Sequence, residues 1–323
     1  MRALILSMVL VGCQSEPGKT TVVGPEAVDT GGAYSPEDGW GEAGVALPTQ
    51  VAEGLDGPAG IVVVDGVLYV AEQGAGRIVR LAEGEVSTLA DGLDAPQGLI
   101  AVADGFVVSD AEGIWTVSAE GEAMRQVADL HPTGALTADE THVWWVTSED
   151  GDGEVWRMSL ANPEEATIVL SDLDEPGGIT HKDGAPVVLE SGRAQAIWGG
   201  TAVEEIQATW STDLPGRGIA ADAQGVVATT ESSRWPNPGW VADLGEDEPV
   251  SLCQIPPEPA GVRLTDTHIY FASKQGIGRV VRAGGTLETV ALRTSVADFL
   301  VWDGQLIWTD PDRGAVWSVA IGD

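Results

Sequence analysis

The 323-residue chain has few basic residues and few cysteines, and both shortages limit what it can do. Its 16 lysines and arginines face 50 acidic residues, which gives a formal net charge of −34. Nucleic-acid binding needs clustered positive charge to displace counterions, so this composition argues strongly against a nucleic-acid partner. It also disfavours peripheral binding to anionic lipid. An acidic surface keeps a secreted protein soluble and can attract divalent or organic cations.

Several motifs of enzymes and nucleotide-binding proteins are missing as well. The sequence contains no Ser or Cys nucleophile motif, no glycine loop that would cradle a phosphate, and no His pair at metal-ligand spacing. Outside the N-terminus, no segment keeps a helical hydrophobic period over three turns. We therefore expect a nearly all-β domain.

What the chain does contain is a motif that returns about every forty residues. Residues 50–60 read QVAEGLDGPAG and residues 88–98 read TLADGLDAPQG, and the Pro-x-Gly corner recurs further along. Successive corners are 38, 36, 44, 40, 43 and 37 residues apart. This spacing, with four short strands per unit, is typical of the blades of a β-propeller. The corner positions are Gly60, Gly98, Gly134, Gly178, Gly218, Gly261 and Asp298.

The last unit is one strand short, and the N-terminal end of the domain can supply it. After Asp298 only three strands fit, whereas residues 49–55 match the outer-strand segment that precedes the second corner. An N-terminal strand that completes the last blade would close the ring and remove a free sheet edge. We predict a seven-bladed propeller closed in this way, with six or eight blades as alternatives.

The N-terminus has the pattern of a secretion signal. An apolar run follows Arg2 and ends in Leu-Val-Gly-Cys13, which resembles the lipobox of bacterial lipoproteins. The resemblance implies a signal peptide at 1–12, a lipidated Cys13 and, because Gln14 follows the cysteine, the outer membrane. Residues 13–45 are rich in Gly, Pro and acidic residues and read as a disordered tether, so the propeller would occupy 46–323. Cys253 then has no disulfide partner and is expected to be a buried apolar filler.

The repeat units resemble two known propeller repeats. The first unit reads Pro58-Ala-Gly-Ile, then Tyr69-Val-Ala-Glu, then Arg77-Ile, which is similar to the NHL repeat. The last unit, Leu-Ile-Trp-Thr-Asp310 followed by Arg313, resembles the YWTD repeat. These resemblances imply an architecture that scaffolds, receptors, lactonases and lyases share, so the fold alone does not give the function.

An acidic residue ends the second strand of most units. In a propeller these ends lie on the face that carries the channel mouth, where a ring of carboxylates could hold Ca²⁺ through six to eight oxygens. The alternative is structural, because Arg77, Arg193 and Arg313 each follow an acid closely and could pair with it inside one blade. The candidate metal ligands are Glu72, Asp110, Glu190, Glu231 and Asp310.

One unit departs from the pattern at the same face. After Glu231 an enlarged loop carries Arg234 and Trp235 between prolines, and Arg217 occupies the corner where other units have small or neutral residues. Two arginines and a tryptophan could bind an anionic or aromatic ligand. The alternative is an ordinary loop insertion, with Arg217 paired to a neighbouring carboxylate.

The enzymes that the repeats resemble supply the main alternative function. SMP-30-type lactonases, which are similar propellers, bind their metal through Glu, Asp and Asn, but this chain has only two asparagines. Streptogramin-type lyases need a His and Glu cluster at the mouth. Three of the four histidines fall in hairpins of the opposite face, and only His131 precedes a corner, as a lone candidate base.

The sequence therefore favours a monomeric, lipid-anchored propeller of the bacterial cell envelope that binds a small molecule or a protein without catalysis. The alternative is a Ca²⁺-dependent lactonase, hydrolase or lyase that uses the carboxylates at the mouth, with His131 as its base. A receptor for a protein partner would instead expose an apolar patch on one face of the ring.

Overall fold

A computed structural model describes most of the predicted domain and one short strand before it. The described residues are 20–22, 47–128, 130–149, 152–163, 165–190, 196–199, 207–212, 216–231, 239–244, 250–256, 258–292 and 294–322. The predicted signal peptide, Cys13, Arg234 and Trp235 lie outside them, and only the backbone is described for Arg217 and Glu231.

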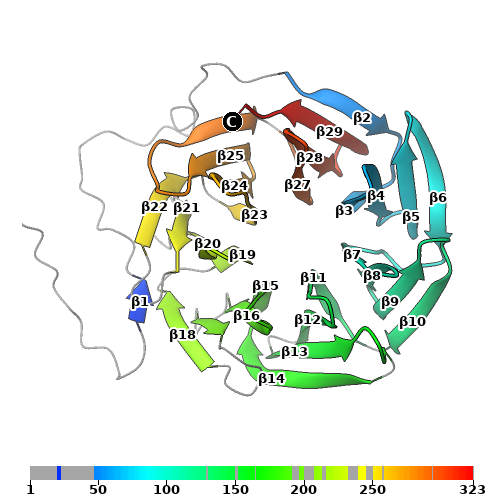
Figure 1. The fold of residues 1–323 in the computed structure, drawn as a ribbon, viewed down its shortest axis with the longest axis horizontal. Helices are drawn as coiled ribbons and strands as arrows, with labels where there is room; N and C mark the ends of the chain where they lie inside the picture. Colours follow the sequence, from blue (N-terminus) through cyan, green and yellow to red (C-terminus); the bar gives the residue numbers. More distant parts are fainter. Residues whose placement is uncertain are drawn as a thin grey trace, which may run out of the picture.

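The described elements are all strands, and they form seven sheets side by side around a central axis (Figure 1). The predicted all-β propeller is thereby confirmed. We call each sheet a blade and number the blades by the order of their innermost strands in the chain. Blade 1 contains β3 (Pro58–Val64), β4 (Val67–Glu72), β5 (Arg77–Ala82) and β6 (Glu85–Asp91). Blade 2 contains β7 (Gly98–Val102), β8 (Gly105–Asp110), β9 (Gly113–Ser118) and β10 (Ala123–Ala128). Blade 3 contains β11 (Pro132–Ala138), β12 (His142–Glu149), β13 (Asp152–Ser159) and β14 (Ala166–Asp174).

The next three blades repeat this order, and blade 4 carries one extra strand on its outer edge. Blade 4 contains β15 (Pro176–Lys182), β16 (Ala185–Glu190), β17 (Ala196–Gly199) and β18 (Gln207–Thr212), with β1 (Thr20–Val22) parallel to β18. Blade 5 contains β19 (Gly216–Asp222), β20 (Gly225–Glu231), β21 (Gly239–Asp243) and β22 (Val250–Ile255). Blade 6 contains β23 (Pro259–Leu264), β24 (His268–Ser273), β25 (Gly276–Val281) and β26 (Glu288–Leu292).

Blade 7 combines the two ends of the domain. Its inner strands are β27 (Phe299–Trp302), β28 (Gln305–Asp310) and β29 (Ala315–Ala320), and its outer strand is β2 (Thr49–Glu53). β2 runs antiparallel to β29, with Thr49 opposite Ser318 and Glu53 opposite Ala315. The predicted closure by an N-terminal strand is therefore present, and it pairs the edge of β29 that would otherwise be free.

The core lies between neighbouring blades, because each sheet is covered on both faces. The second strand of a blade is the most enclosed: in β8, β24 and β28, five of six residues are buried. These strands read as nearly continuous apolar runs, as expected for strands covered on both sides. Trp144, Trp145 and Trp308 are among the largest fully buried side chains. The described part contains no helix long and apolar enough to cross a membrane.

At three of the six corner glycines, Gly60, Gly98 and Gly218, the backbone of the adjacent inner strand approaches too closely for a side chain. A Cβ placed on Gly98 would lie 2.2 Å from the carbonyl oxygen of Gly134 in the next blade, and one on Gly218 would lie 2.2 Å from that of Ala260. Such distances leave no room for alanine without backbone movement. The repeat of about forty residues in the sequence therefore follows from the packing of each blade against the next around the axis.

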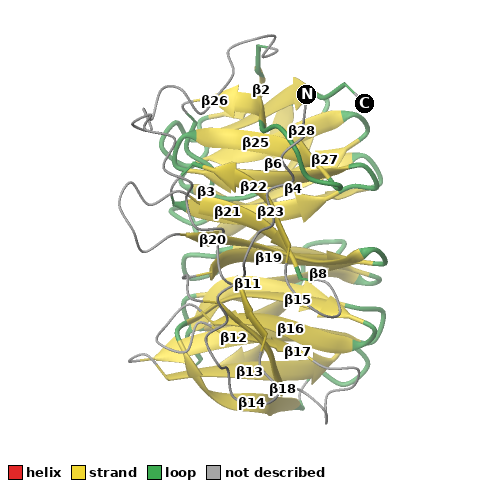
Figure 2. Ribbon diagram, turned by 90° about the vertical axis from the view of Figure 1, so that its left-hand side faces the viewer, coloured by secondary structure: helices red, strands yellow, loops and turns green. Residues whose placement is uncertain are grey.

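The connections between strands divide between the two faces of the disk (Figure 2). Because successive strands are antiparallel, the links from first to second and from third to fourth strands share one face. The links from second to third strands, and from one blade to the next, share the other face. The Pro-x-Gly corners and the ends of the second strands therefore lie at the same face.

Candidate functional site

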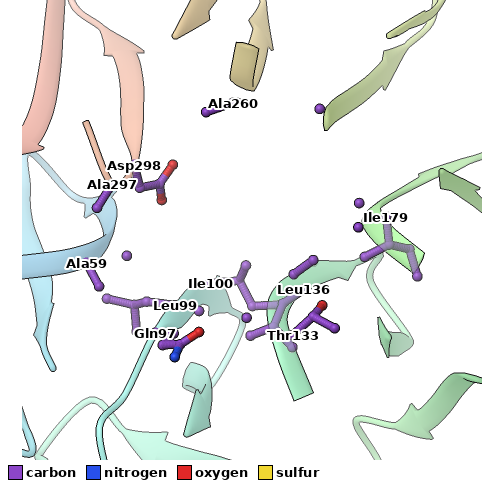
Figure 3. A pocket seen from close by; sticks show the side chains of 18 of the residues that line it. Ala59, Gln97, Leu99, Ile100, Thr133, Leu136, Ile179, Ala260, Ala297 and Asp298 are labelled. Carbon is purple, nitrogen blue, oxygen red and sulfur yellow. The ribbon is translucent and has the colours of Figure 1, made fainter. Parts of the chain in front are cut away.

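The inner strands surround a cavity of about 550 Å³ on the axis, at the face that carries the corners (Figure 3). This volume is within the range of small-molecule sites in proteins. Figure 3 shows the side chains of Asp298, Gln97 and Thr133, which come from three different blades. The lining residues are Ala59, Gly60, Gln73, Gln97, Gly98, Leu99, Ile100, Thr133, Gly134, Ala135, Leu136, Gly177, Gly178, Ile179, Gly218, Ile219, Ala260, Gly261, Val262, Arg263, Ala297 and Asp298.

Most of the wall is glycine, alanine and aliphatic side chains, and its polar groups are few. Gln73, Gln97 and Thr133 are the neutral polar side chains among the lining residues, and Arg263 and Asp298 are the charged ones. Such a wall resembles ligand pockets in which a few polar groups in an otherwise apolar surface fix the ligand's orientation.

The two charged lining residues form an ion pair that joins blades 6 and 7. Arg263 Nη2 lies 2.5 Å from Asp298 Oδ1, and the Arg263 guanidinium also lies 5.4 Å from the centre of the Phe299 ring. Arg263 Nη1 donates to the carbonyl oxygen of Val262 at 3.0 Å. The Arg263 side chain is still 42% exposed, and the residue lines the cavity.

Asp298 occupies the corner where the other six blades have glycine, and its carboxylate spans three blades. Oδ1 accepts the Arg263 bond and the N–H of Phe299 at 2.8 Å, and Oδ2 accepts the N–H of Ile61 in blade 1 at 3.2 Å. Both oxygens thus have protein donors. Asp298 therefore orients Arg263, while Arg263 is the better candidate for contact with a ligand.

The acids at the ends of the second strands are held by protein donors wherever their hydrogen bonds are described. Glu72 is fully buried; Arg77 Nε lies 2.5 Å from its Oε2, and the N–H of Asp56 donates to its Oε1 at 2.8 Å. The hydrogen bond from Arg77 Nε to Glu72 raises the pKa of the Arg77 guanidinium. Asp310 is likewise buried and bonded to Arg313 at 2.5 Å.

Asp110 and Glu190 accept backbone N–H groups, Asp110 from the second hairpin of its own blade and the link before it, and Glu190 from the last residue of β14 in blade 3. Asp110 accepts the N–H groups of Asp94, Glu112 and Gly113 at 2.9–3.0 Å, and Glu190 accepts the N–H of Asp174 at 2.5 Å. A carboxylate with several N–H donors is a strong, charge-assisted acceptor.

A donor sixteen residues earlier is common to all four of these acids. The backbone N–H groups of Asp56, Asp94 and Asp174 serve Glu72, Asp110 and Glu190, and the Thr294 hydroxyl donates to Asp310 at 3.1 Å. The offset is fixed because the donor precedes the corner by a few residues and the acid ends the second strand. We call this arrangement the corner lock.

The corner locks do not assemble the predicted calcium ring from these four acids. Each carboxylate belongs to a separate blade, and no group of three His, Cys, Asp or Glu side chains able to hold a metal occurs within the described part of the chain. The structural interpretation, in which an acid pins the hairpins of its own blade, describes Glu72, Asp110 and Asp310, whereas the bond from Asp174 to Glu190 joins blade 3 to blade 4. Glu231 ends β20 at the corresponding place, and its side chain lies outside the description.

Of the remaining predicted ligand residues, His131 has a described side chain, Arg217 has a described backbone, and Arg234 and Trp235 lie outside the described residues. His131 is exposed just before β11 and is not among the residues that line the cavity. Arg217 lies in β19 at the corner position that Ala59, Gln97 and Thr133 occupy in other blades, so its backbone reaches the rim.

The other three histidines lie on the opposite face, as predicted. His142 begins β12, His268 begins β24 and His181 is near the end of β15. His181 stacks on Trp144 with the ring centres 5.8 Å apart and shares a 2.7 Å hydrogen bond with Thr137. These three histidines therefore lie at the ends of the strands that are opposite the channel mouth.

Sequence reasoning missed Arg263 and the function of Asp298. Asp298 is the single non-glycine residue among the seven corner positions, and this difference indicates that its side chain has a particular contact. Arg263 gave no such signal, because its approach to Asp298 depends on how β23 is placed beside the start of β27.

Comparisons with known proteins identify the fold only. No protein-family model matches the chain, and neither does any curated protein. Solved structures do match. The computationally designed protein Ika8 has a TM-score of 0.58 and 12% identity, covering 86% of this chain and 100% of its own. A gluconolactonase of Xanthomonas campestris has a TM-score of 0.58 and 14% identity, covering 86% of this chain and 90% of its own. The WD40 β-propeller domain of Doa1 has a TM-score of 0.65 and 10% identity, covering 84% of this chain and 96% of its own.

Proposed function

We propose that the chain is a non-catalytic binding propeller that holds a small polar ligand in the channel cavity. The observation that carries this proposal is a 550 Å³ cavity with a half-exposed arginine fixed at its wall by Asp298. A preorganised arginine loses little freedom when it binds an acceptor. The four described corner-lock acids are occupied by protein donors, which favours binding over metal-assisted chemistry.

The ligand class follows from the polar groups of the wall. Arg263 offers N–H donors to carboxylate or carbonyl oxygens, and Gln73, Gln97 and Thr133 can donate to or accept from hydroxyl groups. We infer that the ligand is a polyhydroxylated compound with a carboxylate or carbonyl group, such as a sugar acid or its lactone.

The alternative proposal is a metal-dependent lactonase or hydrolase. It is favoured by the similarity of the fold to a gluconolactonase, although 14% identity carries only the fold. Under this alternative Glu231, Arg217, Arg234, Trp235 and His131 would complete the site, with Ca²⁺ as the predicted ion.

We also propose that the propeller is a monomer tethered to the bacterial cell envelope, at the outer membrane, through a lipid on Cys13. The support is the lipobox-like Leu-Val-Gly-Cys13 behind an apolar run, followed by a tether rich in Gly and Pro. Metabolic labelling with a fatty-acid analogue tests this. Label that disappears in Cys13→Ala supports the anchor, and label that persists overturns it.

Titration calorimetry with D-gluconate and D-glucono-1,5-lactone tests the binding proposal. We expect binding that Arg263→Gln weakens about tenfold or more, since a charge-assisted pair contributes a few kcal/mol when partly buried. Arg80→Gln, at an exposed arginine of β5, is the matched control and should bind as the parent does. If neither compound binds in an Arg263-dependent manner, the proposed ligand class is wrong.

Lactone hydrolysis, followed in the same samples after chelation and with added Ca²⁺, separates the two proposals. Turnover that requires Ca²⁺ and is lost in Glu231→Gln would establish the enzyme and overturn the non-catalytic proposal. Binding without turnover supports the binding propeller.

A further inference from the structure

A second cavity, of about 500 Å³, lies between blades 2 and 3 on the face opposite the channel mouth. The link from β7 to β8 and the start of β10 form one side, and the β11–β12 and β13–β14 links form the other. We call it the blade 2–3 groove. Its lining residues are Val102, Ala103, Asp104, Phe106, Thr116, Val117, Ser118, Glu122, Ala123, Met124, Glu140, Leu160, Ala161 and Pro163.

The floor of the groove is apolar. Phe106 and Val117 are buried beneath it, with 3% and 1% of their surface exposed, and Leu160 and Pro163 supply the wall from blade 3. Met124 also lines the groove and is 64% exposed. A flexible methionine over an apolar floor is suited to contact with an apolar ligand body.

The rim of the groove carries charge of one sign only. Asp104, Glu122 and Glu140 are all exposed and line the groove, whereas no lysine or arginine does. Within the described residues, no ion pair involves any of the three. The nearby Arg125 is bonded to Glu112 at 2.5 Å and lies over the Trp115 ring, so it is engaged elsewhere in blade 2.

We propose that the blade 2–3 groove binds a small organic cation, an ammonium group attached to an apolar body. The apolar part would lie on Phe106 and against Met124, and the ammonium group would face the carboxylates of the rim. The charge complementarity is general as well as local, because a protein of net charge −34 concentrates cations near its surface.

A bare metal ion does not fit this groove as well. The described part of the chain has no group of three side chains able to hold one, and an apolar floor offers a metal ion no oxygen ligands. The proposal is also independent of the channel cavity, which lies on the other face and is lined by an arginine.

The test uses the full chain labelled with ¹³C at the methionine methyl groups. The chain has four methionines, and the Met124 signal is assigned by its loss in Met124→Leu. Met158 is fully buried and is not among the lining residues, so it serves as the internal control. The probes are 2-phenylethylammonium, neutral 2-phenylethanol and anionic 3-phenylpropionate, which share an apolar ring and differ in charge.

We expect 2-phenylethylammonium to shift the Met124 signal in a saturable manner and to leave Met158 unchanged. The neutral probe should bind more weakly and the anionic probe not at all. Each of Asp104→Asn, Glu122→Gln and Glu140→Gln should weaken cation binding about threefold, as single exposed carboxylates do. The triple variant should weaken it about tenfold or more, and added salt should weaken it as well.

The matched control is Glu120→Gln, which removes an exposed carboxylate two residues from Glu122 but outside the groove. It should leave cation binding within about twofold of the parent. The proposal is overturned if Met124 does not respond to the cation, if the three probes bind equally, or if Glu120→Gln weakens binding as much as the groove variants do. Unchanged Met158 signals in every variant show that the fold is intact.

Discussion

Blades 2 and 6 place different residues at the same point of the fold. Blade 2 ends its second strand with Asp110, a buried carboxylate that accepts three backbone N–H groups. Blade 6 ends its second strand with Ser273, whose hydroxyl accepts one, from Gln275 at 3.2 Å. Both blades keep the same four-stranded sheet. The carboxylate is therefore a means of satisfying local donors, and the fold does not require it in every blade.

The sequence gives a chemical reason for the difference. The donor of the corner lock lies sixteen residues before the acid, and sixteen residues before Ser273 the chain has Pro257, which has no N–H to donate. A buried carboxylate at 273 would lack this donor, and an unsatisfied buried charge is costly. An uncharged serine at 273 is therefore the residue expected where position 257 has no N–H to donate.

Removing the acid from blade 2 should have the largest effect. Asp110→Ala leaves three N–H groups without their acceptor, and each such loss costs about 1–3 kcal/mol where the donor is buried. We expect the free energy of unfolding in urea to fall by about 4 kcal/mol. A loss of less than about 1 kcal/mol would show that water replaces the carboxylate and that the corner lock contributes little.

The corner glycines of the two blades should differ nearly as much. A Cβ on Gly98 would lie 2.2 Å from the backbone carbonyl oxygen of Gly134, whereas one on Gly261 would lie 3.3 Å from the edge of the Phe299 ring. We expect Gly98→Ala to cost about 3 kcal/mol through overpacking and Gly261→Ala about 1 kcal/mol or less, because a ring can move slightly. Equal melting temperatures for the two variants would contradict this.

Blade 6 also packs against blade 5 through a buried thiol. Cys253 is free and buried, as predicted, beside Val262 and Phe271 of blade 6. Burial raises its pKa from 9.0 to about 11. Between about pH 9 and 11 the unfolded thiol loses its proton while the folded thiol keeps it, so the free energy of unfolding should fall as pH rises, by about 2 kcal/mol. Cys253→Ala should lack this component, and identical pH profiles would exclude it.

Ser273 should contribute less than the acid of blade 2. Ser273→Ala removes one acceptor and one weak bond to the Gly276 carbonyl oxygen at 3.4 Å. We expect a loss of about 1 kcal/mol, in line with a single neutral hydrogen bond. Both variants should be measured under the same conditions. If Ser273→Ala lowered the free energy of unfolding as much as Asp110→Ala does, the two blades would not differ in this respect.

The smallest effect should come from the exposed ion pair of blade 6. Lys274 Nζ lies 3.2 Å from Glu258 Oε1, but the two side chains are 74% and 57% exposed. Solvent and salt screen such a pair, so Lys274→Gln should change the free energy of unfolding by less than about 0.5 kcal/mol, and less still at high salt. A larger, salt-independent change would mean that the pair is shielded in solution.

The sequence was sufficient to predict the propeller, the strand order within each unit and the closure by residues 49–53, because Pro-x-Gly corners and hairpin turns are local signals. It also located the acids at the ends of the second strands. It could not decide what their oxygens contact, because a metal ring and four separate locks place acids at the same sequence positions. The hydrogen bonds that these oxygens accept, such as the one from the N–H of Asp94 to Asp110, distinguish the two arrangements. Arg263 was missed because its partner lies in the next blade.

The pairing of β2 with β29 has a consequence for the order in which the molecule can fold during synthesis. Each of the first six blades has four strands that follow one another in the chain, with β1 added at the edge of blade 4, so these four-stranded units can form soon after their own residues leave the ribosome. Blade 7 needs both Thr49–Glu53, made before all six other blades, and Ala315–Ala320, made after them. The ring therefore stays open until β29 has been made, and until then β2 has no strand to pair with. A chain truncated before β29 should keep its early blades and remain an open arc with two unpaired edges.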